Sequence, residues 1–280
     1  ALAAATAAMI HRIPIAHIHG GELTLGAVDD AIRHAITKMS TLHFTATEEY
    51  KKRVIQLGET PENVFCVGAL GVENIRTQNL MDKDELSQNI GYSFDIPYVI
   101  VTFHPVTLEN KTAGEQFENL LAALDQYKEY HIIFTKANSD TDGRVINQKI
   151  DQYVERNPDR AIAFVSLGMI RYLSALQYCE MVIGNSSSGI IEAPSFRIPT
   201  INIGNRQFGR IRAESVIDCG NRVEDISTAI QEAKRLKTEG ILQEMENPYE
   251  KSDTSEKICS EIRNYLLQNK TIEKRFYDIS

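Results

Sequence analysis

Short runs of β-branched and aromatic residues alternate along this chain with longer amphipathic segments. Parallel strands need crossover connections, usually helices, so this alternation predicts an α/β protein whose parallel sheets are covered on both faces. The predicted strands are Ile13–His17, Leu42–Ala46, Val64–Val67, Tyr98–Phe103, His131–Thr135, Ala161–Val165, Met181–Ile183 and Pro199–Ile203. The predicted helices are Asp29–Met39, Thr47–Leu57, Gly114–Tyr127, Gly143–Arg156, Gly168–Tyr178, Val223–Leu236 and a final helix at about Ser255–Gln268.

The helix predicted at Thr47–Leu57 shows how local chemistry defines such an element. Thr47 can cap its N-terminus, and Glu48 and Glu49 place negative charge in the first turn, where the helix dipole favours it. Gly58 follows the last apolar residue and ends the helix. This segment is therefore expected to have a structural role.

The length of 280 residues favours two domains, because single cores seldom grow beyond about 250–300 residues. The strand rhythm lapses into polar residues over 71–95 and restarts at Ile96, which places a boundary in that region. Residues 1–10 are typical of an apolar helix with no basic leader and no initiator Met. We therefore expect the sequence to begin part-way through a domain.

The overall composition excludes several classes of protein. A net charge of −8 and a pI near 5.5 argue against a general nucleic-acid binder. No run approaches the roughly 20 apolar residues that span a bilayer. Four widely spaced cysteines contain no C-x-x-C pair, so we expect reduced, mostly buried thiols in a cytoplasmic protein: Cys66, Cys179, Cys219 and Cys259.

The loop Gly184–Gly189 (GNSSSG) follows a predicted strand and precedes a predicted helix. Such a loop offers backbone N–H groups and the positive end of a helix dipole to an anion. Ser186, Ser187 and Ser188 can cradle a diphosphate, and Glu192, expected on the first helical turn, can accept hydrogen bonds from a ribose. The simpler alternative is an ordinary helix cap with a helix-stabilising Glu.

Other polar residues follow neighbouring strands. Arg206 lies closest to the end of its strand and can pair with a phosphate, whereas for Arg212 we prefer a solvated surface role. His104 follows another strand, and a third strand leads to a polar loop. In open α/β sheets, ligands bind beyond the carboxyl ends of the strands. The further polar residues of these loops are Arg210, Asn138, Asp140 and Asp142.

The first part of the chain contains a second polar cluster, HIHGGE at 17–22 followed by DDAIRH at 29–34. His17 and His19 share a face if the strand continues through them. Glu22 and Asp29, beside histidines and Arg33, suit general acid/base chemistry on a sugar carbon.

Two simpler or different roles remain for parts of this cluster. Asp30 is better explained as an acidic residue at a helix start. The H-x-H pattern with an acid can also bind zinc, but no third His or Cys is placed to complete the ligand set, so no metal is expected.

Together these motifs resemble the hydrolysing UDP-N-acetylglucosamine 2-epimerases of bacterial sialic-acid and related nonulosonic-acid pathways. The similarity extends through essentially the whole chain, in order: HIHGGE at 17–22, DDAIRHAITKMS at 29–40, EEYKKRVIQLGE at 48–59, FHP at 103–105, NSDTDG at 138–143, GNSSSGIIEAPS at 184–195 and TINIGNRQFGR at 200–210.

The resemblance implies two Rossmann-like domains of glycosyltransferase-B type, with the N-terminal one incomplete. Residues 1–80 would be the remainder of the catalytic domain, with a C-terminal helix at about 255–280 packing back on it, and 81–254 would bind UDP. The implied reaction is anti elimination of UDP to a glycal, followed by addition of water that inverts C2. The implied UDP-binding residues are His104, Asn138, Ser186, Ser187, Ser188, Gly189, Glu192 and Arg206; the implied catalytic residues are Glu22, Asp29, Arg33 and His19.

This sequence departs from the family pattern in two places. Some relatives have a catalytic Glu where His19 stands, so either Glu22 or His19 inherits that role. The family also carries an earlier segment with an Arg-bearing loop and a G-D-R-x-E motif, neither of which occurs here. We therefore expect part of the site to be missing from this chain.

The resemblance leaves the substrate and the reaction class open. A close variant would act on UDP-2,4-diacetamido-2,4,6-trideoxyglucose in legionaminic-acid synthesis. A glycosyltransferase of the same architecture would not need the acids Glu22 and Asp29, and a non-catalytic UDP-sugar-binding fragment is a third alternative. We expect no cofactor, no nucleic-acid or membrane partner, and a homo-oligomer (a dimer or tetramer).

Overall fold

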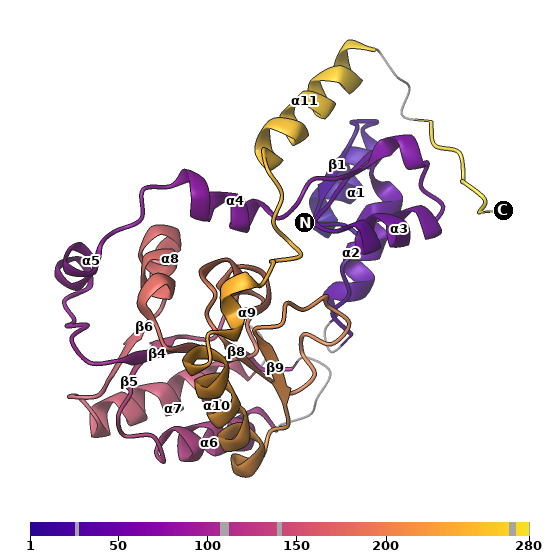
Figure 1. Ribbon diagram of the computed structural model, residues 1–280. Coiled ribbons are helices and arrows are strands. Elements are labelled where there is room, and N and C mark those ends of the chain that lie inside the picture. The colour runs from indigo at the N-terminus through magenta and orange to yellow at the C-terminus, as the bar shows by residue number, and fades with distance from the viewer. Residues whose placement is uncertain (26–27, 107–111, 139–141, 269–272, 280) are drawn as a thin grey trace. The chain divides into compact units, whose positions relative to one another are not determined.

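The computed structural model describes residues 1–25, 28–106, 112–138, 142–268 and 273–279. The chain divides into two compact units (Figure 1). The first unit contains Ala1–Thr24, Val28–Arg76 and Pro248–Ser280, and the second contains Leu25–Ala27 and Thr77–Asn247.

The first unit is built on a three-stranded parallel sheet in the order β1-β2-β3. Its strands are β1 (Ala16–Ile18), β2 (Leu42–Thr45) and β3 (Val64–Cys66). Phe44, Val67, Ile258 and Tyr265 form part of one buried cluster, so the last helix packs with this sheet. The helices are α1 (Leu2–Ile10), α2 (Asp29–Met39), α3 (Glu48–Gln56), α4 (Leu70–Thr77), which leads out of the unit, and α11 (Thr254–Leu267), with a 3₁₀ turn at Pro61–Asn63.

The start of α3 follows the sequence prediction. The Thr47 hydroxyl accepts a hydrogen bond from the Tyr50 backbone N–H at 3.3 Å, and Glu48 and Glu49 lie in the first turn. This bond satisfies one of the N–H groups that a helix start leaves without a partner. The predicted N-cap is therefore confirmed.

The second unit contains a six-stranded parallel sheet in the order β6-β5-β4-β7-β8-β9. Its strands are β4 (Tyr98–Thr102), β5 (His131–Thr135), β6 (Ala161–Phe164), β7 (Met181–Gly184), β8 (Thr200–Ile203) and β9 (Val216–Cys219). Counted from β4, this is the 3-2-1-4-5-6 order of a Rossmann fold. The chain changes its direction of progress across the sheet between β4 and β7, which makes the ends of these two strands the expected ligand site.

Helices cover this sheet and complete its core. Phe117, Ile150 and Ile230 come from three different helices and belong to one buried cluster with strand residues such as Val99 and Ile132. The helical segments are α5 (Lys83–Ile90), α6 (Ala113–Leu124), α7 (Gly143–Arg156), α8 (Gly168–Tyr178), α9 (Ser188–Ile191) and α10 (Val223–Thr238), with 3₁₀ turns at Ala193–Phe196 and Ile241–Glu244.

Several elements differ from the sequence predictions. The short edge strand β9 was not predicted, because its exposed Asp218 interrupts a run of only four residues. The polar segment over 71–95 contains α4 and α5, and a capping box of Asp82 and Glu85 starts α5. Burial of the cysteines was also over-predicted, since Cys179 is buried but Cys259 is exposed.

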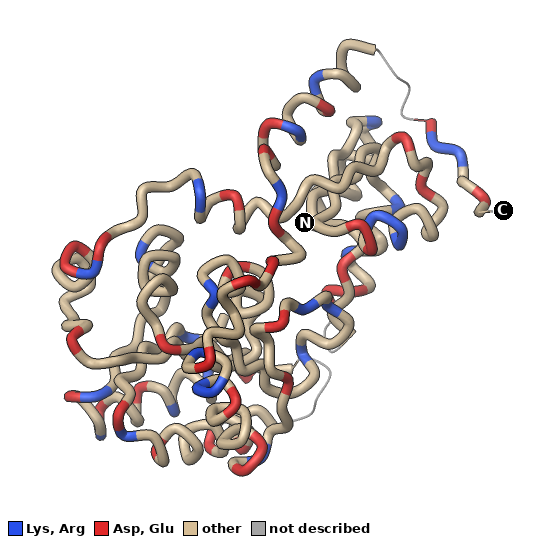
Figure 2. Tube along the Cα trace, viewed as in Figure 1, with Lys and Arg blue, Asp and Glu red and all other residues tan. Residues whose placement is uncertain are grey.

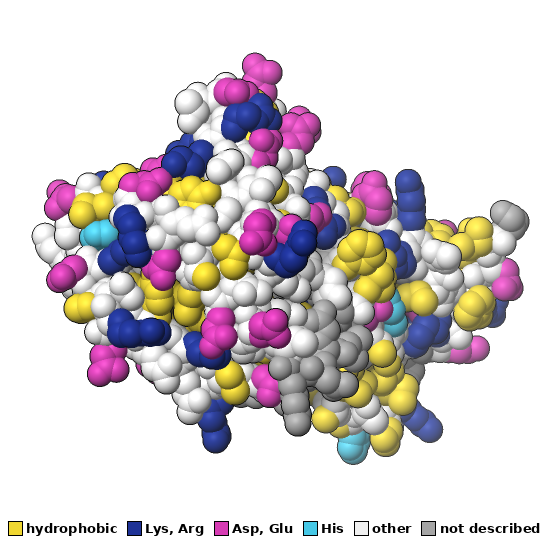
Figure 3. Space-filling model, turned by 90° about the horizontal axis from the view of Figure 1, so that it is seen from below, with side chains coloured by type: hydrophobic (Ala, Val, Ile, Leu, Met, Phe, Trp, Pro, Cys, Tyr) yellow, Lys and Arg dark blue, Asp and Glu magenta, His cyan; other side chains and the backbone are white. Residues whose placement is uncertain are grey.

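Charged residues of both signs are mixed along the trace (Figure 2), and charged side chains of both signs are mixed over the face shown in Figure 3. Among the coloured side chains of that face, no extended field of one sign is visible. Within the described ranges, no helix has the length and apolar character needed to cross a membrane.

Gly184 allows β7 to approach β4 closely at the strand ends. Its φ of +138° disfavours an L side chain, and a Cβ there would overlap the Thr102 carbonyl oxygen. Only glycine fits such a backbone approach without displacing a neighbour. The close spacing of β4 and β7 at the expected ligand site therefore depends on this residue.

We predict that Gly184→Ala lowers the free energy of unfolding by about 3 kcal/mol or more, because it adds a backbone clash to an unfavourable φ. Gly91→Ala is the matched control: Gly91 has a φ of +68°, but a Cβ there meets nothing within 4 Å. The control should lose only about 1–2 kcal/mol. Urea unfolding measures both values, and equal losses would show that the close approach contributes nothing.

Candidate functional site

A buried amide joins the loops that follow β4 and β7. Asn185 comes directly after β7 and is 1% exposed. Its Oδ1 accepts from the His104 backbone N–H at 2.7 Å, and its Nδ2 donates to the His104 carbonyl oxygen at 2.8 Å. The side chain thus satisfies both backbone groups of His104 and holds that residue beside the serine loop.

The backbone of Asn185 extends the same connection to the loop after β8. Its carbonyl oxygen accepts from Arg206 Nη1 at 3.0 Å and from Gln207 Nε2 at 2.8 Å. Sequence reasoning did not select Asn185 or Gln207. The sequence signal that could have identified Asn185 is its position as a polar residue directly after an apolar strand.

A cavity of about 380 Å³ lies at these strand ends. It is lined by three residues predicted from the sequence, His104, Ser186 and Ser188. Its remaining wall was not predicted, because an apolar helix start looks like ordinary core: Thr102, Thr135, Lys136, Val165, Ser166, Leu167, Gly168, Met169 and Tyr172. Val165 is 80% exposed and Met169 is 46% exposed, so apolar surface is available to a ligand there.

Two hydroxyl groups of this wall have unused hydrogen-bonding capacity. The Tyr172 and Ser188 hydroxyl oxygens are buried and make no hydrogen bond of ordinary geometry in the described part of the chain. Burial raises the pKa of Tyr172, although the nearby Ser188 hydroxyl opposes the shift. Buried polar atoms usually have partners, so a pair without them at a cavity suggests that a ligand supplies them.

The other predicted UDP-binding residues lie around this cavity without lining it. Asn138 lines a neighbouring cavity of about 670 Å³ with Asp142, and its backbone N–H donates to His104 Nδ1 at 3.4 Å. Asp140 lies outside the described residues. Gly189 lies in α9, Ser187 and Glu192 lie at the two ends of that helix, and Arg206 lies in the loop after β8. None of these four residues lines the cavity.

The expected position of Glu192 was wrong. Helix α9 has only four residues, and Glu192 follows it instead of lying on the first turn of a longer helix. Pro194 explains the difference, because proline has no N–H to donate to the Ile190 carbonyl, so the α-helical hydrogen bonds end with α9 and the 3₁₀ turn Ala193–Phe196 follows. Arg212, for which a solvated surface role was preferred, is partly exposed: its Nε lies 2.8 Å from the exposed Asp218, and its Nη1 donates to the Arg210 carbonyl.

In the first unit, the HIHGGE loop and the start of α2 form a second polar cluster. Glu22 is 2% exposed, and its Oε1 lies 2.9 Å from His19 Nδ1. Arg33 Nη1 donates to the Glu22 carbonyl oxygen and to Thr24 Oγ1, both at 3.1 Å. The predicted residues Glu22, His19 and Arg33 are therefore brought together.

The two aspartates at the start of α2 have different surroundings. Asp30 accepts from the Thr24 backbone N–H at 2.8 Å, so it fixes the loop as well as starting the helix. Asp29 occupies the first position of α2 and is exposed. Strand β1 ends at Ile18 and His19 has a φ of +63°, so His17 and His19 do not continue one strand face.

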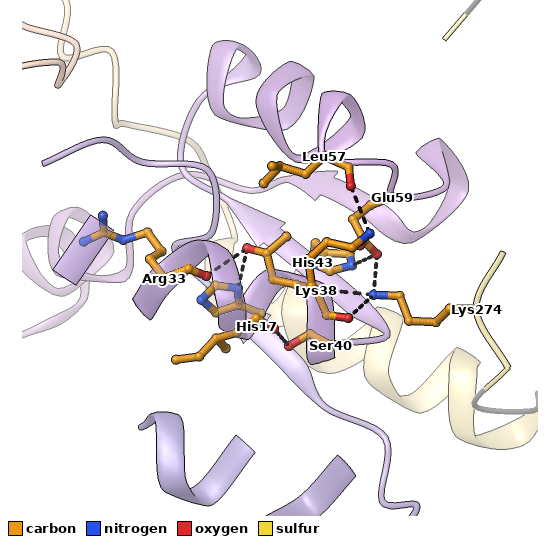
Figure 4. Close-up of polar contacts among 10 residues, drawn as sticks. His17, Arg33, Lys38, Ser40, His43, Leu57, Glu59 and Lys274 are labelled. Atoms are coloured by element: carbon orange, nitrogen blue, oxygen red, sulfur yellow. Dashed lines mark hydrogen bonds and ion pairs between the residues drawn. The ribbon is translucent and has the colours of Figure 1, made fainter. Parts of the chain in front are cut away.

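His17 lies beside Arg33, one member of this cluster (Figure 4). Thr37 Oγ1 donates to the Arg33 carbonyl at 3.2 Å, so it accepts the His17 Nδ1–H at 3.1 Å. Burial, and then the nearby His43 and Arg33, lower the pKa of His17 to about 4. The ring is therefore neutral at pH 7 and serves the structure of α2.

Figure 4 also shows a buried carboxylate with three cationic or imidazole neighbours. Glu59 is 2% exposed and contacts Lys38 Nζ at 2.7 Å, His43 Nε2 at 2.9 Å and Lys274 Nζ at 2.6 Å. Burial alone would raise the pKa of Glu59, but the hydrogen bonds from His43, Lys274 and Lys38 lower it to about 2. This network joins the C-terminal segment to α2 and β2, and it has a structural role.

Among the residues with described positions, no group of three or more His, Cys, Asp and Glu side chains is arranged to hold a metal ion. The cluster of Glu22, His19 and Arg33 presents a carboxylate, an imidazole and a guanidinium.

We predict that acid destabilises the protein through His17. Its pKa is about 4 in the folded protein and near 6.5 when exposed, so the unfolded chain binds protons more strongly between these values. Stability should fall as the pH drops from about 6.5 to 4, by up to about 2–3 kcal/mol for this residue. Burial lowers the pKa of His43 as well, so that residue adds to the same slope.

Urea midpoints at pH 7 and pH 5 test this expectation. His17→Asn should reduce the pH dependence, and the matched control His11→Asn, at an exposed histidine, should leave it unchanged. A His17→Asn variant with the wild-type slope would contradict the assignment.

Comparison with known proteins adds a separate line of evidence. Residues 1–263 match the family model for UDP-N-acetylglucosamine 2-epimerase. The chain is 42% identical over 276 residues to the polysialic acid biosynthesis protein P7 of Escherichia coli, covering 98% of this chain and 70% of that protein. It is also 42% identical over 238 residues to the GDP/UDP-N,N'-diacetylbacillosamine 2-epimerase (hydrolyzing) of Campylobacter jejuni, covering 84% of this chain and 62% of that protein.

Solved structures support the fold. The structure of S. aureus MnaA with UDP aligns with a TM-score of 0.75 at 19% identity, over 99% of this chain and 74% of that chain. The predicted α/β class, with two parallel sheets of glycosyltransferase-B-like type, is confirmed.

Proposed function

Because this chain belongs to the UDP-N-acetylglucosamine 2-epimerase family, we propose that the full-length protein is a hydrolysing epimerase that converts UDP-N-acetylglucosamine and water to N-acetylmannosamine and UDP. The observation that carries the proposal is the cavity at the ends of β4 and β7, where His104, Ser186 and Ser188 meet. The cluster of His19, Glu22 and Arg33 beside Asp29 supplies groups that can move protons.

The second unit binds the nucleotide in this proposal. The exposed apolar surfaces of Val165 and Met169 suit the face of a uracil ring, and the Tyr172 and Ser188 hydroxyls suit polar atoms of the nucleotide. Asn138 donates to His104 Nδ1, so the neutral ring carries its hydrogen on Nε2, where it can donate to a phosphate oxygen.

The loops around the cavity complete the nucleotide site. The Arg206 guanidinium donates from Nη1 to the Asn185 carbonyl oxygen beside the serine loop, and its planar set of N–H groups matches the geometry of a phosphate, so Arg206 contacts the diphosphate in this proposal. Ser187 and Gly189 contribute the rest of the serine loop, and Glu192 accepts from the ribose hydroxyls. Asn138 closes the side of the site toward the neighbouring cavity.

The first unit handles hydrogens at the sugar. Removal of the C2 hydrogen and loss of UDP give a glycal, and water then adds with the opposite configuration at C2. These steps need placed acids and bases, so no cofactor is proposed. Asp29 is exposed at the start of α2, while Arg33 is held by Glu22 and Thr24 and compensates negative charge nearby.

The substrate is the least constrained part of the proposal. The 42% identity to the C. jejuni enzyme supports a second candidate, the same reaction on a UDP-2,4-diacetamido-2,4,6-trideoxy sugar. A substrate pocket distinguishes an acetamido group at C4 from a hydroxyl there by a few specific contacts. Those contacts decide which of the two UDP-sugars is the substrate.

An oligomer of identical chains remains a prediction. Helix α1 exposes Leu2, Met9 and Ile10, with only Ala5 buried among its residues, and such an apolar surface favours burial against another surface.

The reaction class is tested by incubating the full-length protein with each UDP-amino sugar and no acceptor. We expect UDP and a free 2-epimerised sugar in equal amounts by NMR, with deuterium from solvent at C2 in D₂O. Release of UDP only when an acceptor is added would instead identify a glycosyltransferase. Binding without turnover of either substrate would identify a UDP-sugar-binding protein.

The division of roles between the two units is tested with paired variants. Asp29→Asn should lower turnover by about 10²-fold or more while changing UDP affinity less than about 3-fold, because it lies on the proton-handling side. Asp30→Asn is the matched control, since an amide oxygen still accepts from Thr24 N–H, and it should be much milder. Arg206→Met should weaken UDP binding, measured by calorimetry. Loss of UDP affinity in Asp29→Asn would contradict this division.

A further inference from the structure

We propose that His19 and Glu22 act together in proton transfer. His19 Nε2 takes the proton from C2 of the sugar, and Glu22 orients the imidazole ring and stabilises its protonated form. The inference deepens the proposed function and rests on it. The HIHGGE motif offers two candidates for the group of this loop that reacts with the sugar, His19 and Glu22, and the structure favours His19.

The exposure of the two side chains differs sharply. The His19 side chain is 33% exposed, whereas the Glu22 side chain is 3% exposed. A group that reacts with a substrate must present an atom to it, so the imidazole can meet a sugar and the buried carboxylate cannot without rearrangement. Glu22 is therefore the positioning residue, and His19 is the catalytic one.

The hydrogen bond between them determines which ring nitrogen is basic. Glu22 Oε1 lies 2.9 Å from His19 Nδ1, and a carboxylate is an acceptor only, so it selects the tautomer with hydrogen on Nδ1. Nε2 then carries the lone pair, and it makes no hydrogen bond to any residue with a described position. When Nε2 accepts a proton, the buried carboxylate stabilises the resulting imidazolium, as in other carboxylate–imidazole pairs.

The backbone places this ring outside the strand. His19 has a φ of +63°, which is uncommon for a residue with a side chain. Its N–H donates to the Phe44 carbonyl at 2.8 Å, and Arg53 Nη1 donates to the Gly21 carbonyl at 2.5 Å, so the loop is held on both sides. Strained backbone maintained in this way is typical of functional positions.

The proposed step balances as follows. Neutral His19 Nε2 accepts the C2 proton, the C2–H electron pair becomes the C1=C2 double bond, and UDP leaves with the electron pair of the C1–O bond. Water then adds its oxygen to C1 while a second group, Asp29 in the proposed function, delivers a proton to the opposite face of C2 and regains one from that water. The imidazolium releases its proton to solvent, so one water is consumed and one proton is released.

Chemical rescue tests His19 directly. His19→Gly suits the positive φ and leaves a space for added imidazole. We expect turnover to fall by about 10²- to 10⁴-fold, UDP affinity to stay within about 3-fold, and imidazole to restore part of the activity in a saturable way. Turnover near the wild-type value, or a folded, UDP-binding variant that imidazole does not rescue, would overturn the proposal.

A second variant separates positioning from simple structural support. Glu22→Gln keeps the shape and one oxygen acceptor but removes the charge, so kcat should fall with KM little changed. Imidazole should rescue His19→Gly/Glu22→Gln much less than His19→Gly. Equal rescue would show that Glu22 has no part in the step. Wild-type protein without turnover on either UDP-amino sugar would refute the proposed function itself, a result distinct from failure of the His19 variants alone.

Discussion

The amide of Asn185 is the contact on which the nucleotide side of this protein depends. It pairs with both backbone groups of His104, and its own carbonyl accepts from Arg206 and Gln207. Three loops that follow β4, β7 and β8 are thereby fixed to one buried residue. A buried amide is costly to leave unsatisfied, so the loops cannot separate without losing several hydrogen bonds together.

The strand order explains why the Asn185 contacts lie at a ligand site. Because the order reverses between β4 and β7, the connecting segments diverge there and leave space at the strand ends. Gly184 lets β4 and β7 approach closely, and the Asn185 side chain then hydrogen-bonds to the backbone of His104 just beyond the strand ends. In the first unit, the loop carrying His19 and Glu22 is held by Arg33 and Arg53 in a comparable way. Each unit thus presents polar groups on a rigid support, as binding and proton transfer require.

Much of this arrangement was readable from the sequence because it follows from strong local patterns. The strands around His104 and Ser186 are buried, β-branched runs, and parallel topology places their ends on one edge, so the residues after them were expected to meet. The helix bounds of α2 followed from its acidic start and amphipathic repeat. Prediction failed where the deciding contact is distant or the signal is weak. Lys274 contacts Glu59, a residue far away in the sequence, and no local pattern predicts that contact. Asn185 has the sequence character of an ordinary loop residue. The apolar residues of the cavity wall between Val165 and Tyr172 are typical of a buried core. Pro194 is the sequence signal that shortens α9 and leaves Glu192 beyond its end.

Amide hydrogen exchange of the full-length protein, with and without UDP, tests the central claim most directly. UDP bound at the ends of β4 and β7 should increase protection at His104 and throughout Asn185–Gly189, with smaller changes at the start of α8. Protection confined to other segments, with exchange at these amides unchanged, would contradict the account.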